Sequence, residues 1–221
     1  MNKIPSTIDI NPSSATPIAS VIWLHGLGAD GNDFVPIVER FTSLQDKVRF
    51  VFPHAPVRAV TVNGGMRMRA WYDIAGLDLA RNEDFAGIQE SEQLIRLLIE
   101  REQGLGIAAD RIVLAGFSQG GAMAMQVGLR FPERLAGIIA LSSYLPLPDK
   151  FVAERHAVNQ STPVLMAHGL FDPVVPLILG QTSRERLEGL GYKVEWHSYP
   201  MAHSVVPEEI EEIYQFLERV L

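Results

Sequence analysis

The sequence predicts an α/β fold in which a mostly parallel sheet carries helices on both faces. Short, continuously apolar segments such as 111–115 and 163–167 alternate with segments of helical periodicity along the 221 residues. Strands that are apolar at consecutive positions are typical of parallel sheets, because such strands are buried on both faces. No linker, repeat or low-complexity segment interrupts the alternation, so we expect residues 1–221 to form a single domain.

The first half of the chain supplies two strand candidates and two helix candidates. Residues 18–24 and 48–52 are apolar runs of strand length, and 32–41 between them has helical character. A long helix is expected over 82–103, where apolar residues recur on one face, and Gly104 ends it. These elements begin the alternation that defines the fold class.

Residues 57–80 break the pattern and are expected to form an irregular hairpin region. Gly64 and Gly65 indicate a turn, because glycine accepts the positive φ that tight turns require. A short strand is expected at 69–74.

The second half continues the alternation of strands and helices. We expect strands at 111–115, 135–141, 163–167 and 193–199, and helices at 118–131, 179–190 and from 207 onward. The last helix has the clearest start, because Pro207 suits a first helical position. Glu208 and Glu209 follow it and complement the positive end of the helix dipole.

Composition excludes several classes of function. The formal charge of −7 disfavours nucleic acid as a partner, and the chain has no cysteine for a disulfide, a thiolate metal site or a thiol nucleophile. No segment approaches the run of about 20 apolar residues that crosses a bilayer. We therefore expect a cytoplasmic protein without integral membrane association and without a metal.

The most informative segment is Gly116-Phe117-Ser118-Gln119-Gly120. It has the G-x-S-x-G pattern and lies between a predicted strand and a predicted helix. A sharp turn at this place strains the serine backbone and exposes its hydroxyl at the top of a sheet. Ser118 is therefore the candidate nucleophile.

A serine hydroxyl needs a base, and in this type of fold the acid precedes the base along the chain. His203 lies in the loop after the last predicted strand and is the candidate base. His168 comes before any suitable acid, His197 lies inside a strand, and His156 lies far from any strand end. We expect His168 to have a structural role.

Asp172 is the candidate acid, because it lies in the loop after the predicted strand 163–167. Asp149 and Glu154 lie in a long connection instead. The other interpretation of Asp172 is an ordinary turn residue before Pro173, since Asp-Pro commonly opens turns.

Acyl transfer also requires N–H donors for the oxyanion. We expect one from Gln119, which follows the nucleophile at a helix N-terminus, and a second from Leu27 in the His25–Gly28 loop. The alternative for this loop is a plain glycine turn or a phosphate cradle, although no phosphate-binding motif is complete here. His25 is expected to be structural.

Four motifs together resemble the small carboxylesterase and acyl-protein thioesterase family of α/β-hydrolases. They are Leu24–Gly28, Met68–Ile74, Gly116–Gly121 and Asp172–Pro176. The resemblance implies an α/β-hydrolase fold without a large separate lid domain. It also implies a serine esterase that needs no cofactor, with Ser118, Asp172 and His203 as its triad.

The same resemblance implies an acyl pocket beside the triad. Residues 66–74 would form its hairpin wall, and Trp71, Met66 and Val175 would line it. Trp71 is open to a second interpretation as an ordinary core aromatic. Arg67 and Arg69 either face solvent or attract an anionic leaving group.

The expected substrate is a small-molecule ester with a short to medium acyl chain, and thioesters and lysophospholipids are further candidates. The expected assembly is a monomer or a homodimer. Two alternatives stay open at this point. One is a hydrolase-fold protein that binds a small ligand with little turnover. The other is an enzyme like dienelactone hydrolase, although those enzymes usually carry a cysteine nucleophile.

Overall fold

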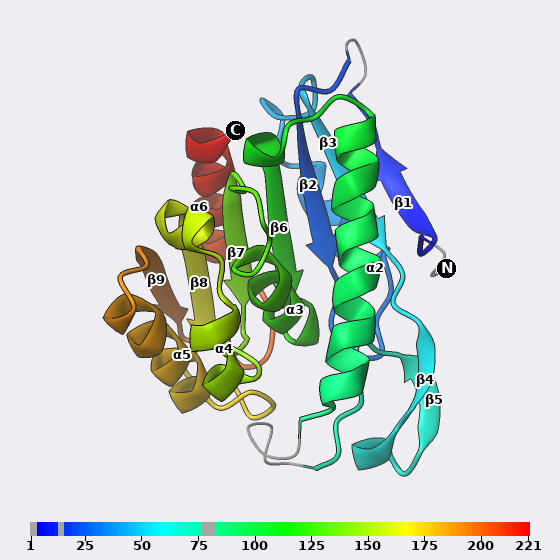
Figure 1. The fold of residues 1–221 in the computed structure, drawn as a ribbon, viewed down its shortest axis with the longest axis vertical. Helices are drawn as coiled ribbons and strands as arrows, with labels where there is room; N and C mark the ends of the chain where they lie inside the picture. The colour runs from blue at the N-terminus through cyan, green and yellow to red at the C-terminus, as the bar shows by residue number, and fades with distance from the viewer. Residues whose placement is uncertain (1–3, 13–15, 77–82) are drawn as a thin grey trace.

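A seven-stranded sheet forms the centre of the molecule in the computed structural model, which describes residues 4–12, 16–76 and 83–221 (Figure 1). The strand order is β1-β3-β2-β6-β7-β8-β9. All neighbours are parallel except β1, which pairs antiparallel with β3 at one edge. The strands are β1 (Thr7–Ile10), β2 (Ala19–Leu24), β3 (Val48–Pro53), β6 (Ile112–Phe117), β7 (Gly137–Leu141), β8 (Val164–Gly169) and β9 (Val194–Tyr199).

Helices lie on both faces of this sheet. They are α1 (Val35–Val38), α2 (Phe85–Gly104), α3 (Gln119–Gly128), α4 (Pro148–Glu154), α5 (Leu177–Gly189) and α6 (Pro207–Val220). Short segments of 3-10 helix occur at Thr61–Asn63, Ala109–Arg111 and Ala157–Ser161. Figure 1 shows α2 and α3 in front of the sheet and α6 behind it.

The two faces have separate cores, which follow from the alternation of side chains along each strand. On β2, Ile22 and Leu24 join the core under α2 and α3, whereas Val21 and Trp23 join the core under α1 and α6. All six residues of β2 are buried. The prediction of a mostly parallel sheet covered on both faces is confirmed.

Several predicted elements have different bounds in the structure. The helix expected at 32–41 contracts to α1, because turns replace its first and last residues. The strand expected at 69–74 was wrong, since the strand in this region is β5 (Met66–Arg69) and its partner is β4 (Val57–Val60). Asn82, the expected start of the long helix, lies outside the described residues.

The hairpin turn was predicted correctly. Gly64 and Gly65 have φ angles of 64° and 77°, which suit glycine. In contrast, β1 and α4 were not anticipated. None of the helices in the described ranges is both long enough and apolar enough to cross a membrane.

Candidate active site

Ser118 lies on a strained turn between β6 and α3. Its φ of 56° and ψ of −120° are unusual for a residue with a side chain. The backbone around it is fixed, because its N–H donates to the Leu141 carbonyl at 2.8 Å. Its carbonyl accepts a hydrogen bond from Ser143 Oγ at 2.8 Å. The surrounding structure therefore holds the strained conformation that the G-x-S-x-G pattern predicted.

Glycines at positions 116 and 120 are required by close backbone contacts. A Cβ on Gly120 would lie 2.1 Å from the Leu24 carbonyl oxygen, and one on Gly116 would lie 2.3 Å from the Gly120 backbone. These contacts bring α3 against the end of β2. The start of the helix thereby lies beside the loop that follows β2.

Asp172 and His203 meet in the structure, as their positions after β8 and β9 predicted. His203 Nδ1 lies 2.7 Å from Asp172 Oδ2, and the Asp172 side chain is fully buried. The other carboxylate oxygen accepts the Val174 and Val175 N–H groups, each at 2.9 Å. Asp172 is thus both a turn residue and the partner of His203.

His168 supports this turn from the other side. Its Nε2 lies 2.8 Å from the Val175 carbonyl oxygen and 3.7 Å from Asp172 Oδ2. Burial lowers the pKa of His168, although its contact with the Val175 carbonyl opposes the shift. A neutral His168 donates its Nε2 proton to Val175, which agrees with the structural role expected for it.

His25 also has a structural role. Its Nδ1 donates to the Gly26 carbonyl at 2.7 Å, and its Nε2 accepts the Ala55 N–H at 3.0 Å. Burial lowers the pKa of His25 to about 4, so the ring is neutral near pH 7. The imidazole braces the loop after β2 against the end of β3.

The Gln119 side chain joins the nucleophile turn to the segment after β5, a role that the sequence did not reveal. Its Oε1 accepts the Trp71 N–H, and its Nε2 donates to the Tyr72 carbonyl, both at 2.7 Å. Trp71 in turn donates its indole N–H to the His25 carbonyl at 2.9 Å. Hydrogen bonds therefore connect three separate segments of the chain beside Ser118.

Two backbone N–H groups beside Ser118 are free to bind an anion. A Cβ on Gly26 would lie 3.5 Å from Ser118 Cβ, so the loop after β2 is adjacent to the serine. The next residue is Leu27, and Gly28 N–H is already used by the Arg69 carbonyl at 2.9 Å. Within the described part of the chain, the Leu27 and Gln119 N–H groups have no acceptor.

The residues expected to line an acyl pocket lie in three different environments. Trp71 is completely buried, Val175 is buried beside Asp172, and Met66 is 65% exposed on the hairpin. Arg67 donates to the Val57 carbonyl and Arg69 to the Ala55 carbonyl, so both guanidinium groups brace the hairpin region.

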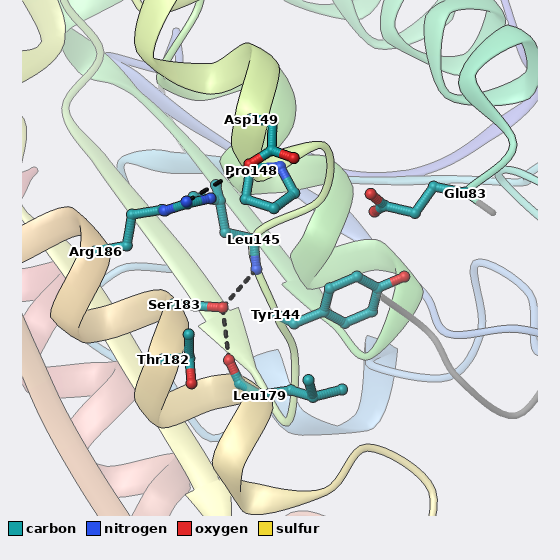
Figure 2. A pocket seen from close by; sticks show the side chains of 9 residues that line it. All are labelled: Glu83, Tyr144, Leu145, Pro148, Asp149, Leu179, Thr182, Ser183 and Arg186. Atoms are coloured by element: carbon teal, nitrogen blue, oxygen red, sulfur yellow. Dashed lines mark hydrogen bonds and ion pairs between the residues drawn. The ribbon is translucent and has the colours of Figure 1, made fainter. Parts of the chain in front are cut away.

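A cavity of about 290 Å³ lies between the segment after β7, α4 and α5 (Figure 2). Its lining consists of Glu83, Tyr144, Leu145, Pro148, Asp149, Leu179, Thr182, Ser183 and Arg186. Tyr144 directly follows Ser143, which holds the Ser118 carbonyl, and its hydroxyl lies 3.0 Å from that of Tyr72. The cavity therefore borders the segments that support the nucleophile, but Trp71, Met66 and Val175, the residues expected to line an acyl pocket, are not part of its lining.

One group of side chains in the described ranges could approach a metal ion. Glu195 and His197 on β9 and Glu212 on α6 have ligand atoms within 4.8 Å of one another. Glu195 is already paired with Arg219 at 2.6 Å. None of these residues belongs to the Ser118, Asp172 and His203 set.

Two relatives support the interpretation that this chain is a hydrolase. Acyl-protein thioesterase 1 of Gibberella zeae is 45% identical over 220 residues, covering 95% of this chain and 94% of its own. The protein of the same name from Neurospora crassa is 47% identical, covering 93% of this chain and 88% of its own.

Solved structures have the same fold. Arabidopsis thaliana SOBER1 superposes with a TM-score of 0.86 at 29% identity, covering 91% of this chain and 98% of its own. Zea mays acyl-protein thioesterase 2 gives a TM-score of 0.83 at 28% identity, covering 97% and 98% respectively. The sequence profile of the phospholipase/carboxylesterase family matches residues 6–221. The chain therefore belongs to the phospholipase/carboxylesterase family of α/β-hydrolases and is an ester hydrolase.

Proposed function

We propose that Ser118, Asp172 and His203 form the catalytic triad of this hydrolase. The observation that carries the proposal is the 2.7 Å contact between His203 Nδ1 and Asp172 Oδ2. A proton held on Nδ1 leaves Nε2 as the acceptor, which is the tautomer that a general base requires. The strained backbone of Ser118 is the second supporting feature.

The reaction proceeds through an acyl-enzyme. His203 Nε2 takes the Ser118 hydroxyl proton as Oγ attacks the acyl carbonyl, and it then gives that proton to the leaving alcohol or thiol. The buried Asp172 carboxylate stabilises the imidazolium that forms between these two steps. Water attacks the acyl-enzyme by the same route and returns Ser118 to its free form.

The oxyanion is bound by the N–H groups of Leu27 and Gln119. Both lack an acceptor in the described part of the chain, and Gln119 begins α3, where the helix dipole favours an anion. The side-chain bonds from Gln119 to Trp71 and Tyr72 hold this donor in place. Preorganised donors of this kind lower the barrier without reorganising during the reaction.

The substrate class is a carboxylic ester or thioester with a medium acyl chain. At about 30 Å³ for each water-sized group, the cavity near Tyr144 accommodates about ten such groups. We propose that this cavity receives the acyl chain, and its size then favours a medium chain over an acetyl group. The names of the Gibberella and Neurospora relatives favour acyl thioesters of proteins, and the absence of cysteine favours a cytoplasmic setting.

Ser118→Ala tests the triad directly. We expect hydrolysis of p-nitrophenyl octanoate and octanoyl thioesters to fall to near background, because no other hydroxyl replaces the nucleophile. Ser204→Ala, which changes a serine in the loop that follows His203, is a matched control that should keep most of the activity. Retention of wild-type turnover by Ser118→Ala would refute the assignment.

A chain-length series separates the candidate substrates. We expect kcat/KM to rise from acetyl to octanoyl for both oxygen esters and thioesters. A series that falls steadily with length would contradict the use of the cavity. Preference for lysophospholipids over both ester types would move the physiological substrate to that class.

A further inference from the structure

A carboxylate forms part of the wall of the cavity proposed to hold the acyl chain. Glu83 lies just before α2, and Figure 2 shows its carboxylate directed toward the cavity from the side where Tyr144 also lies. Leu145, Pro148 and Leu179 supply apolar lining nearby. An alkyl chain alone would offer this carboxylate no hydrogen bond.

The Glu83 carboxylate has hydrogen-bonding capacity to spare. Both of its oxygens contact a single donor, the Leu147 N–H, at 3.1 and 3.0 Å. A carboxylate offers about four acceptor sites. Within the described residues no second donor reaches it, so positions on the cavity side are available to a ligand.

The surrounding charges do not neutralise this group. Burial raises the pKa of Glu83 to about 7, and the negative charge of Asp149 adds to the effect, while the Leu147 N–H and Arg130 oppose it. Arg186, the cation in the cavity lining, is paired with Asp149 at 3.6 Å instead. A ligand that donates a hydrogen bond would therefore relieve a partly desolvated acceptor.

We propose that Glu83 selects acyl groups that carry a hydrogen-bond donor, such as a hydroxyl, on the part of the chain lying in this cavity. This inference rests on the proposed function, since it assumes that the cavity receives the acyl chain of the substrate. A hydroxyl reaching Glu83 would supply a second donor to this carboxylate, whereas an alkyl chain would bury its cavity-side sites unpaired. Unpaired buried polar groups are the strongest source of discrimination that a binding site possesses.

Glu83 also has a structural role that any test must separate from selectivity. Its bonds to the Leu147 N–H hold a residue with a φ of 49°, directly before α4. Glu83→Gln keeps an oxygen acceptor for this N–H and removes the negative charge. Glu185→Gln removes a charge from the exposed surface of α5, outside the cavity lining, and is the matched control.

The experiment compares p-nitrophenyl octanoate with p-nitrophenyl 8-hydroxyoctanoate. The quantity measured is the ratio of kcat/KM for the hydroxylated ester to that for the plain ester. Because hydrogen bonds to an ionised acceptor are about twice as strong as neutral ones, we expect this ratio to be about tenfold lower in Glu83→Gln than in the wild type. Glu185→Gln should keep the wild-type ratio, and a purely structural role for Glu83 would slow both esters equally.

The wild-type ratio at two pH values provides a test that needs no variant. A pH effect on the chemical steps shared by the two esters cancels from the ratio, whereas protonation of Glu83 changes it. The charged groups that act on Glu83 are Asp149 and Arg130, and the titratable groups facing it are Tyr72 and Tyr144, whose pKa values lie above their usual range. We expect a smaller ratio at pH 5.5 than at pH 8.5.

The outcomes distinguish this inference from the proposed function. Failure of the wild type to hydrolyse either ester would refute the proposed function itself. Hydrolysis of both esters with a ratio near one at pH 8.5, or a ratio unchanged in a folded Glu83→Gln, would overturn the selective role of Glu83 and leave the triad standing.

Discussion

Replacing Asp172 with asparagine separates the two roles of its carboxylate. In the turn, one oxygen accepts the Val174 and Val175 N–H groups, and the amide oxygen of asparagine can still do so. Toward His203, however, an amide N–H₂ would replace the oxygen that now lies 2.7 Å from Nδ1. His203 would then accept through Nδ1 and carry its proton on Nε2, where it cannot take the serine proton.

The expected loss follows from this change of tautomer. The equivalent substitution in serine proteases lowers kcat by about 10⁴. At about 1.36 kcal/mol for each factor of ten, the transition state loses about 5 kcal/mol of stabilisation. The free energy of unfolding should fall by only about 1 kcal/mol, because the Val174 and Val175 N–H groups would donate to a neutral amide oxygen instead of a charged carboxylate.

The assay is steady-state hydrolysis of p-nitrophenyl butyrate, with the free energy of unfolding measured in urea on the same samples. Asp110→Asn is the matched control, since this aspartate lies in the 3-10 turn before β6, at the opposite end of that strand from Ser118. We expect it to keep wild-type kcat. A loss of only a few-fold in a folded Asp172→Asn would refute the reasoning.

Two further predictions concern the fold around the site. Gly120→Ala should lower the free energy of unfolding by about 1–3 kcal/mol and reduce kcat, because the new Cβ would meet the Leu24 carbonyl oxygen and displace α3. Gly104→Ala is the control and should cost no stability, because a Cβ at this position meets nothing within 4 Å. If urea unfolding shows equal losses of stability for both variants, a steric clash at Gly120 is not the cause. Glu209 is fully buried on α6, and burial raises its pKa from 4.5 to about 8, with only a partial offset from the Val206 N–H. The folded state therefore binds this proton more tightly than the unfolded state does, so the stability it contributes is lost as pH rises from about 4.5 to 8. The free energy of unfolding of the wild type should fall by about 3–5 kcal/mol between pH 5 and pH 8 because of this group. The free energy of unfolding of Glu209→Gln should not show this fall. Parallel pH profiles of unfolding free energy for the two proteins would exclude this role.

The sequence predicted the central strands well because β2, β6, β7 and β8 are almost continuously apolar and buried. Segments 111–115 and 163–167 correspond to β6 and β8, and their loops contain Ser118 and Asp172 as expected. The chain order of acid and base rests on the same topology, which places His203 after β9. Local patterns sufficed here because each candidate follows the end of its own strand.

The remaining features depend on contacts between distant segments. The edge strand β1 has only four residues and is mostly half-buried, so its alternation of Ile8 and Ile10 with polar residues is too short to identify a strand. The Gln119 side chain reaches Trp71 and Tyr72, which lie 48 and 47 positions away, and no local pattern encodes such a bond. The cavity combines Glu83 with residues of α4 and α5, which only the folded chain brings together.

The most direct test of the central claim is the mass of the protein during turnover. Brief mixing with p-nitrophenyl octanoate and acid quenching should add one octanoyl group, and peptide mapping should locate it on Ser118. His203→Ala should accumulate little of this adduct, because the base is missing. An octanoyl group on another residue, or rapid hydrolysis by Ser118→Ala, would contradict the account.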